Sequence, residues 1–263
     1  MNRLDDKFGE LQEIPRAALM PYLPLGYPTL ELSRELIRAV CDAGADILEL
    51  GMPFSDPLAD GPAIQHATQI ALQNGMNMNR CLDMVLDARV HGVTIPLVLM
   101  GYYNPILNYG IEKFARDAFE VGVDGVIVPD LPIEEAEPLQ RALHHQDVHL
   151  VLLAAPTSSE ERLRKIGAAT RGFLYLVSLT GVTGERDSLP EGLEDFILRA
   201  RAATDKPICV GFGISNPQAA QRVAKIADGV IIGSALVTRI GEPQSAVENA
   251  TLFVSEIRRA MQA

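Results

Sequence analysis

The sequence contains only three cysteines, Cys41, Cys81 and Cys209, and none of them lies in a CxxC pair. An odd number of cysteines without paired spacing argues against both a disulfide framework and a zinc site. We therefore expect three reduced thiols in a cytoplasmic protein. The five histidines match no metal-ligand spacing either, so we predict surface or structural roles for them and no bound metal.

Long apolar runs are also missing, and none reaches the ~20 residues that a membrane-spanning helix needs. The first twenty residues are charged and lack the apolar core of a secretory signal. Basic residues are in deficit, since 23 Lys and Arg face 34 Asp and Glu, which gives a formal net charge of −11. An acidic surface repels nucleic acid and anionic lipid, so neither is expected as a partner. An anionic substrate would need a local binding site, which backbone amides at helix N-termini can supply.

No linker, low-complexity tract or run of like charge interrupts the chain. Its 263 residues, 48% of them hydrophobic, match the ~250 residues of one (β/α)₈ barrel. On length alone, two smaller domains are also possible. We predict a single domain over residues 1–263.

Short apolar segments recur along the chain and alternate with stretches of helical spacing. Thr29–Ala43 shows that spacing, with Leu36, Ile37 and Val40 on one face. Apolar strands that alternate with helices are typical of a parallel sheet covered by helices. The predicted strands are 18–23, 46–50, 96–100, 125–128, 148–153, 173–177, 207–210 and 229–232.

Eight such strands favour a closed barrel over an open doubly wound sheet. No GxGxxG motif follows the first strand, which argues against a dinucleotide-binding fold of the open type. Further helical patterns cover 4–13, 79–91 and 245–262, and the first of these could plug the bottom of the barrel. The predicted fold is α/β, a (β/α)₈ TIM barrel with an extra N-terminal helix and added helices around the ring.

The segment Asp46–Leu50 carries an acidic residue where an apolar core would not tolerate one. Because strand side chains alternate, Leu48 and Leu50 should face the covering helices, and Ile47 and Glu49 the barrel interior. Active sites of these barrels lie at the C-terminal ends of the strands. Burial there would raise the pKa of Glu49, which suits a group that exchanges a proton near neutral pH. Alternatively, Glu49 pairs with a buried base, although no Lys or Arg lies at a neighbouring strand end.

The loop that follows, 51–62, contains three prolines, two glycines and two aspartates. Prolines restrict the loop to few conformations, and a loop of this length is typical of a lid or binding loop. The run Asp60-Gly61-Pro62 also resembles a helix start. Asp60 is therefore either a functional carboxylate or the cap of a helix that begins at Pro62 or Ala63.

Glycine-rich segments follow the last three predicted strands, at 178–184, 211–217 and 233–235. Glycine lets backbone N–H groups approach an anion, and a helix dipole adds to the attraction. Barrels often bind phosphate with the loops after strands seven and eight. Ordinary turns would explain one or two of these segments, and all three together indicate a phosphate site. Tyr175 within a strand and Tyr102 after one are interpreted only as packing residues.

Seven further segments cover nearly the whole chain in one order: 49–62 (ELGMPFSDPLADGP), 96–110, 122–135, 155–163, 176–186 (LVSLTGVTGER), 210–217 and 227–237. Together they resemble the tryptophan synthase α-subunit family. The resemblance implies a lyase of tryptophan biosynthesis that performs retro-aldol cleavage of indole-3-glycerol phosphate to indole and glyceraldehyde 3-phosphate.

The same resemblance implies roles for individual residues. Glu49 would take the proton from the glycerol hydroxyl and help protonate indole C3, and Asp60 would accept a hydrogen bond from the indole N–H. Tyr175 matches a tyrosine near Glu49 and the substrate. The implied phosphate-binding residues are Gly184, Gly213, Gly233, Ser234 and Ala235, and the implied indole pocket consists of Tyr22, Ile64, Met100, Ile127, Pro129, Thr183 and Ile232.

The implied partner is a pyridoxal-phosphate β subunit in an α₂β₂ heterotetramer, and this chain would need no cofactor of its own. Loops 53–60 and 179–189 would close over the substrate and bring Asp60 and Thr183 together. The positions implied to face the partner are Asp56, Pro57, Asn104, Asn108 and Pro132.

Two alternatives remain at this point. Another phosphosugar barrel enzyme would usually carry Lys or His at a strand end, and no predicted strand end here does. A non-catalytic subunit that only activates a partner would be indicated by loss of either carboxylate, and Glu49 and Asp60 are both present.

Overall fold

The computed structural model describes residues 2–14, 16–177, 192–211 and 213–262. The strands are β1 (Ala18–Pro24), β2 (Leu48–Gly51), β3 (Leu97–Met100), β4 (Gly125–Ile127), β5 (His149–Val151), β6 (Leu153–Ala154), β7 (Leu174–Val177), β8 (Ile208–Gly211) and β9 (Gly229–Ile232). The helices are α1 (Arg3–Glu13), α2 (Leu30–Asp42), α3 (Pro62–Gln73), α4 (Met78–Val90), α5 (Tyr103–Tyr109), α6 (Ile111–Val121), the 3₁₀ helix η1 (Ile133–Glu135), α7 (Glu137–His145), α8 (Glu160–Ala169), α9 (Leu193–Arg201), α10 (Pro217–Ala224), α11 (Ser234–Arg239) and α12 (Ala246–Gln262).

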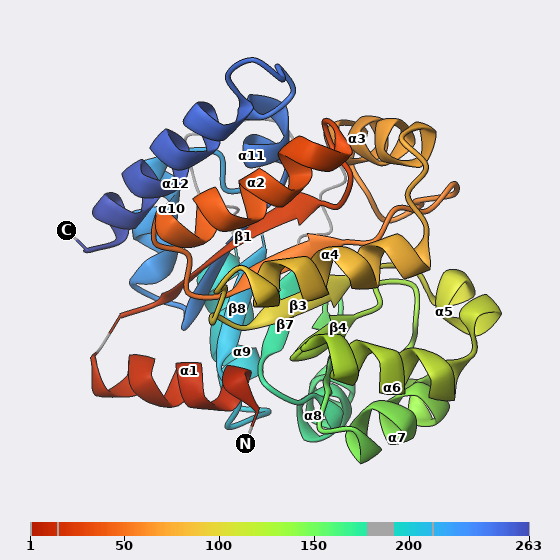
Figure 1. Cartoon of the computed structure of the whole chain (residues 1–263). Coiled ribbons are helices and arrows are strands. Elements are labelled where there is room, and N and C mark those ends of the chain that lie inside the picture. The colour runs from red at the N-terminus through yellow and green to blue at the C-terminus, as the bar shows by residue number, and fades with distance from the viewer. Residues whose placement is uncertain (1, 15, 178–191, 212, 263) are drawn as a thin grey trace.

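The strands pair in parallel, in the order β5-β4-β3-β2-β1-β9-β8-β7-β6. β5 and β6 are two halves of one segment, separated only by Leu152, and the first half pairs with β4 and the second with β7. The Leu152 carbonyl also accepts a hydrogen bond from the backbone N–H of Tyr175, at 3.1 Å. The sheet therefore closes on itself through this segment, and the predicted (β/α)₈ barrel is confirmed (Figure 1).

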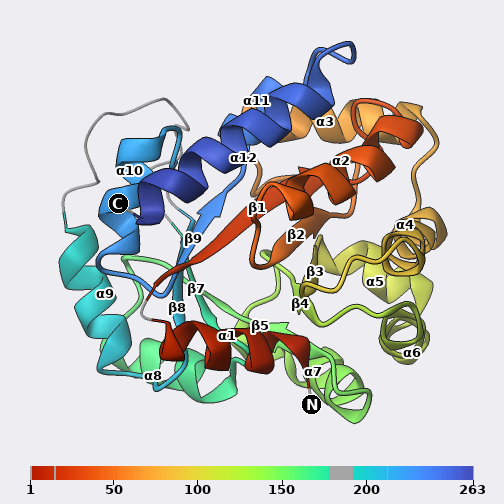
Figure 2. The same ribbon diagram turned by 60° about the vertical axis from the view of Figure 1, so that its left-hand side comes forward.

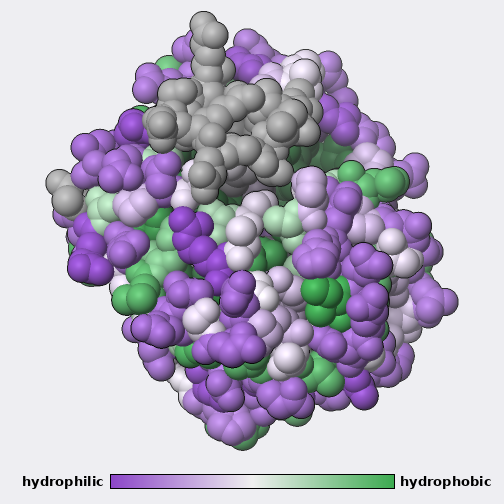
Figure 3. All heavy atoms as spheres, turned by 90° about the horizontal axis from the view of Figure 1, so that it is seen from above, coloured by the Kyte–Doolittle hydropathy of each residue, from purple (hydrophilic) through white to green (hydrophobic). Residues whose placement is uncertain are grey.

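The covering helices follow the apolar spacing of their sequences. α2 begins after Thr29, whose side chain accepts a hydrogen bond from the Leu32 N–H, and it buries Leu36, Ile37 and Val40 against the sheet. The opposite faces of the helices are polar, and the face of the molecule in Figure 3 is accordingly mostly hydrophilic. No helix in the described part of the chain is both long and apolar enough to cross a membrane.

Helix α1 closes the end of the barrel where the strands begin, as Figure 2 shows. Leu4, Phe8 and Leu11 recur at helical spacing on its inner face and pack into the same buried cluster as Ile47 on β2. The Asn2 side chain caps the helix by accepting a hydrogen bond from the Leu4 N–H at 2.9 Å. The extra N-terminal helix is thus confirmed, and it covers the barrel interior at this end.

Candidate active site

Among the strands that the structure describes, only β2 contains an acidic side chain, that of Glu49. On β2 the side chains of Leu48 and Leu50 pack into the outer layer and that of Ile47 into the barrel interior, so Glu49 also faces inward. Its side chain is 1% exposed, and neither carboxylate oxygen has a hydrogen-bond partner among the described residues. A buried carboxylate without partners is costly to ionise, so Glu49 does not stabilise the fold. Its presence in the barrel indicates a functional role.

Other buried carboxylates in the barrel are fully paired. Asp46, three residues earlier, accepts hydrogen bonds from Arg16 and Arg258 at 2.8 and 2.9 Å. Asp124 at the start of β4 is likewise held by two arginines. Both lie where strands begin, whereas Glu49 lies within β2. The contrast excludes pairing with a buried base as the explanation for Glu49 within the described part of the chain.

The electrostatic surroundings of Glu49 suit proton transfer. Burial, followed by the nearby charge of Asp60, raises the pKa of Glu49 from 4.5 to about 8. A carboxyl group with a pKa near 8 is mostly protonated at pH 7 and still loses its proton readily. Glu49 can therefore act first as an acid and then as a base in one reaction.

Asp60 lies at the end of the loop after β2, directly before α3. The N-cap of α3 is Gly61, and no side chain caps this helix. The Tyr102 hydroxyl instead lies within hydrogen-bonding reach of the Asp60 carboxylate, and it accepts a hydrogen bond from the Ala59 N–H at 2.9 Å. Of the two interpretations of Asp60, helix cap or functional carboxylate, the geometry does not support the cap.

Burial raises the pKa of Asp60 from 3.8 to about 6. The hydrogen bond with Tyr102 acts in the opposite direction and keeps the increase smaller. At neutral pH Asp60 is therefore mostly ionised while Glu49 is mostly protonated. Two neighbouring carboxyl groups whose pKa values are separated in this way can divide the roles of proton donor and charge stabiliser.

Two buried tyrosines flank the carboxylates. Tyr22 on β1 is in register with Glu49, and Tyr175 reaches inward from β7. A side chain at Gly51 would overlap the Tyr22 hydroxyl, and one at Gly211 would overlap the Tyr175 hydroxyl. Burial is the main reason why the pKa values of both tyrosines are raised well above 10, followed by the charge of Asp60 for Tyr22 and that of Glu49 for Tyr175. Both phenols are therefore neutral hydrogen-bonding groups in the site.

The glycine segment after β9 lies close to these residues. A Cβ atom at Gly233 would lie 3.7 Å from Cδ1 of Ile64 and 3.8 Å from Cβ of Tyr22, so this segment adjoins two of the predicted pocket residues. Gly233 is the N-cap of α11, and its carbonyl accepts hydrogen bonds from the N–H groups of residues 236 and 237. The N–H groups of Ser234 and Ala235, in the first turn, have no acceptor within the helix.

Of the remaining predicted phosphate-binding residues, the structure describes one, Gly213. Gly213, between β8 and α10, is exposed and has a positive φ of 39°, which glycine adopts without strain. Gly184 lies outside the described residues. Among the residues after β8 the hydroxyl of Ser215 is buried without a described hydrogen-bond partner, and sequence reasoning missed it.

Most predicted pocket residues lie at strand ends on the same side of the barrel. Ile127 and Ile232 are buried, whereas Met100, Pro129 and Ile64 are half-buried. Thr183, like loop 179–189, lies outside the described residues.

The residues predicted to face a partner are accessible. Asp56, Asn104, Asn108 and Pro132 are exposed, and Pro57 is half-buried. Leu58 beside them is 93% exposed, although it is a large apolar residue. Because Leu58 is an apolar residue in a polar loop, the sequence alone could have indicated it as a contact residue for a partner.

Tyr102 is the most informative residue that sequence reasoning undervalued. It lies two residues after the end of β3, and a polar atom near a strand end was the available signal. The histidines behave largely as expected, because His66, His91, His144 and His145 are exposed. No group of potential metal ligands occurs in the described part of the chain.

Comparisons with known proteins agree with this geometry. Residues 8–263 match the family model described as tryptophan synthase alpha chain. The chain is 48% identical to the tryptophan synthase alpha chain of Chloroflexus aggregans, over 98% of this chain and 97% of that one, and 46% identical to that of Chloroflexus aurantiacus, over 99% of each. The crystal structure of tryptophan synthase subunit alpha from Legionella pneumophila superposes with a TM-score of 0.92 at 38% identity, covering 100% of this chain and 99% of that one. A structure of Mycobacterium tuberculosis tryptophan synthase gives 0.93 at 37% identity, with the same coverage.

Proposed function

The chain belongs to the tryptophan synthase alpha chain family, and we propose that it is a lyase that cleaves indole-3-glycerol phosphate with Glu49 and Asp60 as its reacting groups. The observation that carries the proposal is the buried Glu49 carboxyl group, which has no partner among the described residues and has a pKa of about 8. Another phosphosugar barrel enzyme is not favoured, because the family match extends over nearly the whole chain.

The proposed reaction transfers two protons, and both transfers involve Glu49. Protonated Glu49 donates its proton to C3 of the indole ring, which leaves a positive charge on the ring. The resulting carboxylate then removes the proton of the glycerol hydroxyl next to the ring. As that oxygen becomes an aldehyde, the carbon–carbon bond breaks and its electrons return to the ring, so indole and glyceraldehyde 3-phosphate leave and Glu49 is protonated again.

Asp60 would stabilise the positive ring by accepting a hydrogen bond from the indole N–H. Its pKa of about 6 leaves it ionised while Glu49 holds a proton. The negative charge lies where positive charge develops, in a site shielded from bulk water, which is the arrangement that stabilises a transition state. Tyr102 would position Asp60, and Tyr175 would contact the substrate beside Glu49.

The phosphate group of the substrate would bind to backbone amides rather than to basic side chains. The N–H groups of Gly233, Ser234 and Ala235 at the start of α11 and of Gly213 after β8 are the proposed donors, together with Gly184. Binding through amides suits a chain with a net charge of −11, because it needs no local surplus of Lys and Arg.

We further propose that the chain works with a pyridoxal-phosphate β subunit in an α₂β₂ assembly in the cytoplasm. Exposed Leu58 and Asn104, together with Asp56, support a partner surface beside the site. A large exposed apolar side chain is readily buried in an interface. The three free thiols support a reducing compartment.

The deciding experiment measures indole release from indole-3-glycerol phosphate by purified chain, with and without a β subunit, for Glu49→Gln. Release should fall by at least about a hundredfold, the low end for loss of a general acid–base group. Calorimetric binding of the substrate should persist, because Gln has nearly the same shape. Glu35→Gln, on the exposed face of α2, is the matched control and should leave turnover unchanged. Undiminished turnover in Glu49→Gln would refute the proposal.

A further inference from the structure

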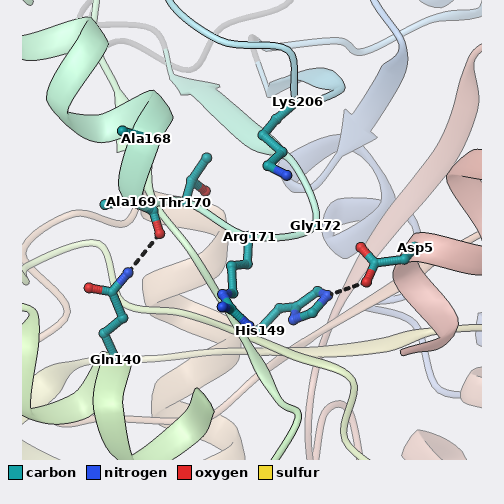
Figure 4. Close-up of a pocket in the computed structure, with 9 residues that line it drawn as sticks. All are labelled: Asp5, Gln140, His149, Ala168, Ala169, Thr170, Arg171, Gly172 and Lys206. Carbon is teal, nitrogen blue, oxygen red and sulfur yellow. Dashed lines mark hydrogen bonds and ion pairs between the residues drawn. The ribbon is translucent and has the colours of Figure 1, made fainter. Parts of the chain in front are cut away.

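A cavity of about 390 Å³ lies at the opposite end of the barrel from Glu49, beside α1. Its walls come from segments that lead into strands, with His149 opening β5, Gly172 preceding β7 and Lys206 preceding β8. Asp5 from α1 and Arg171 also line the cavity and carry charged side chains (Figure 4). The proposed lyase reaction uses none of these residues.

Two basic side chains of this cavity lack acidic partners. The Lys206 ammonium makes no hydrogen bond or ion pair with any described residue, and in Figure 4 its side chain extends toward the cavity. The Arg171 guanidinium makes one side-chain contact there, at 3.3 Å from Nε2 of the exposed His144. By contrast, Arg16 and Arg258 at the same end of the barrel are paired with the buried Asp46. Both basic groups therefore lack a described carboxylate partner, in a chain with a net charge of −11.

Two groups that would repel an anion have hydrogen-bond partners of their own. The Asp5 carboxylate pairs with Nε2 of His149 at 2.8 Å, and the Ala169 carbonyl accepts a hydrogen bond from the Gln140 amide at 2.7 Å. His149 is 4% exposed, and its Nδ1 atom is buried without a described hydrogen-bond partner. Gly172 contributes no side chain, so the cavity stays open beside the histidine ring. The cavity thus presents two basic side chains without carboxylate partners, and its Asp5 carboxylate is hydrogen-bonded to His149.

We propose that this cavity binds a small oxyanion, a phosphate or carboxylate group, between the Lys206 ammonium and the Arg171 guanidinium. A guanidinium offers two parallel N–H donors to such a group, and an ammonium adds a compact positive charge. A volume of about 390 Å³ falls at the small end of ligand pockets and suits a metabolite of few heavy atoms. The site is separate from the proposed phosphate-binding amides of α11, because it lies where the strands begin.

The test is titration of the isotope-labelled full chain with inorganic phosphate, at constant pH and ionic strength, followed by NMR. The amide signal of Gly172 and the ring signals of His149 should shift in a saturable way. Signals of Gly233 and Ser234 report separately on the opposite end of the barrel, so failure of this proposal and failure of the proposed function are distinguishable. Acetate and citrate in parallel titrations show whether the cavity prefers phosphate or carboxylate.

The double variant Arg171→Gln/Lys206→Gln should weaken phosphate binding, read from the Gly172 signal, at least about tenfold, since it removes two charge-assisted contacts. Lys225→Gln is the matched control, because Lys225 lines a neighbouring cavity and not this one, and it should leave the affinity unchanged. An unshifted Gly172 signal in phosphate, acetate and citrate overturns the proposal. So does a phosphate affinity that the double variant retains.

Discussion

Replacement of Glu49 by Gln should stabilise the folded chain, and the gain should grow with pH. In the folded chain the pKa of Glu49 is about 8, whereas the ordinary value of a glutamate, expected in the unfolded chain, is 4.5. The folded state therefore holds this proton more tightly than the unfolded state does. Stability is highest below pH 4.5, falls as the pH rises toward 8, and then levels off. The glutamine side chain cannot ionise, so the variant escapes this loss.

The size of the effect follows from the two pKa values. They differ by about 3.5, and each unit corresponds to about 1.4 kcal/mol. The loss in the unmodified chain should thus approach roughly 5 kcal/mol above pH 8 and amount to roughly 3 kcal/mol at pH 7. Such losses are a large part of the ~5–15 kcal/mol that stabilises a typical protein.

Urea unfolding of both chains at pH 5, 7 and 8.5 gives the comparison directly. The free energy of unfolding of Glu49→Gln minus that of the unmodified chain should rise over this range by several kcal/mol. Using the difference cancels the other titrating groups and the fixed cost of burying an amide. A difference that stays constant from pH 5 to 8.5 would show that Glu49 is not a desolvated acid, and the assignment of its proton-transfer role would lose its basis.

Three other changes test separate parts of the structure. Tyr102→Phe should raise the pKa of Asp60 above about 6, so the acid limb of the pH profile for indole formation should move to higher pH. Phe8→Ala should leave a cavity under the barrel and lower the free energy of unfolding by roughly 3–5 kcal/mol in urea titrations, provided that α1 packs as described. Gly211→Ala should force Tyr175 to move, costing about 1–3 kcal/mol and reducing turnover, whereas Gly9→Ala, whose Cβ would meet no atom within 4 Å, should not lower stability.

The layout of the barrel could be predicted because it depends on local patterns. Apolar runs, helical spacing and capping residues act within one turn or one strand, so α1 and α2 are found close to their predicted bounds. Alternation along β2 placed Glu49 inside the barrel for the same reason. The division of the fifth strand at Leu152 was not predictable, since it reflects which neighbour each half pairs with.

Relations between distant segments required the tertiary structure. Whether Asp60 caps α3 or turns toward another group depends on Tyr102, 42 positions further along the chain, and no local pattern encodes that contact. The same holds for Asp46, which is paired, and Glu49, which has no partner among the described residues, although the two look alike in sequence. The Arg258 that pairs with Asp46 comes from the final helix. The amino-acid order by itself determined which side chains face inward and where acid and glycine residues follow strands. Only folding decided which charges are neutralised, because an ion pair forms where the barrel brings distant residues within reach.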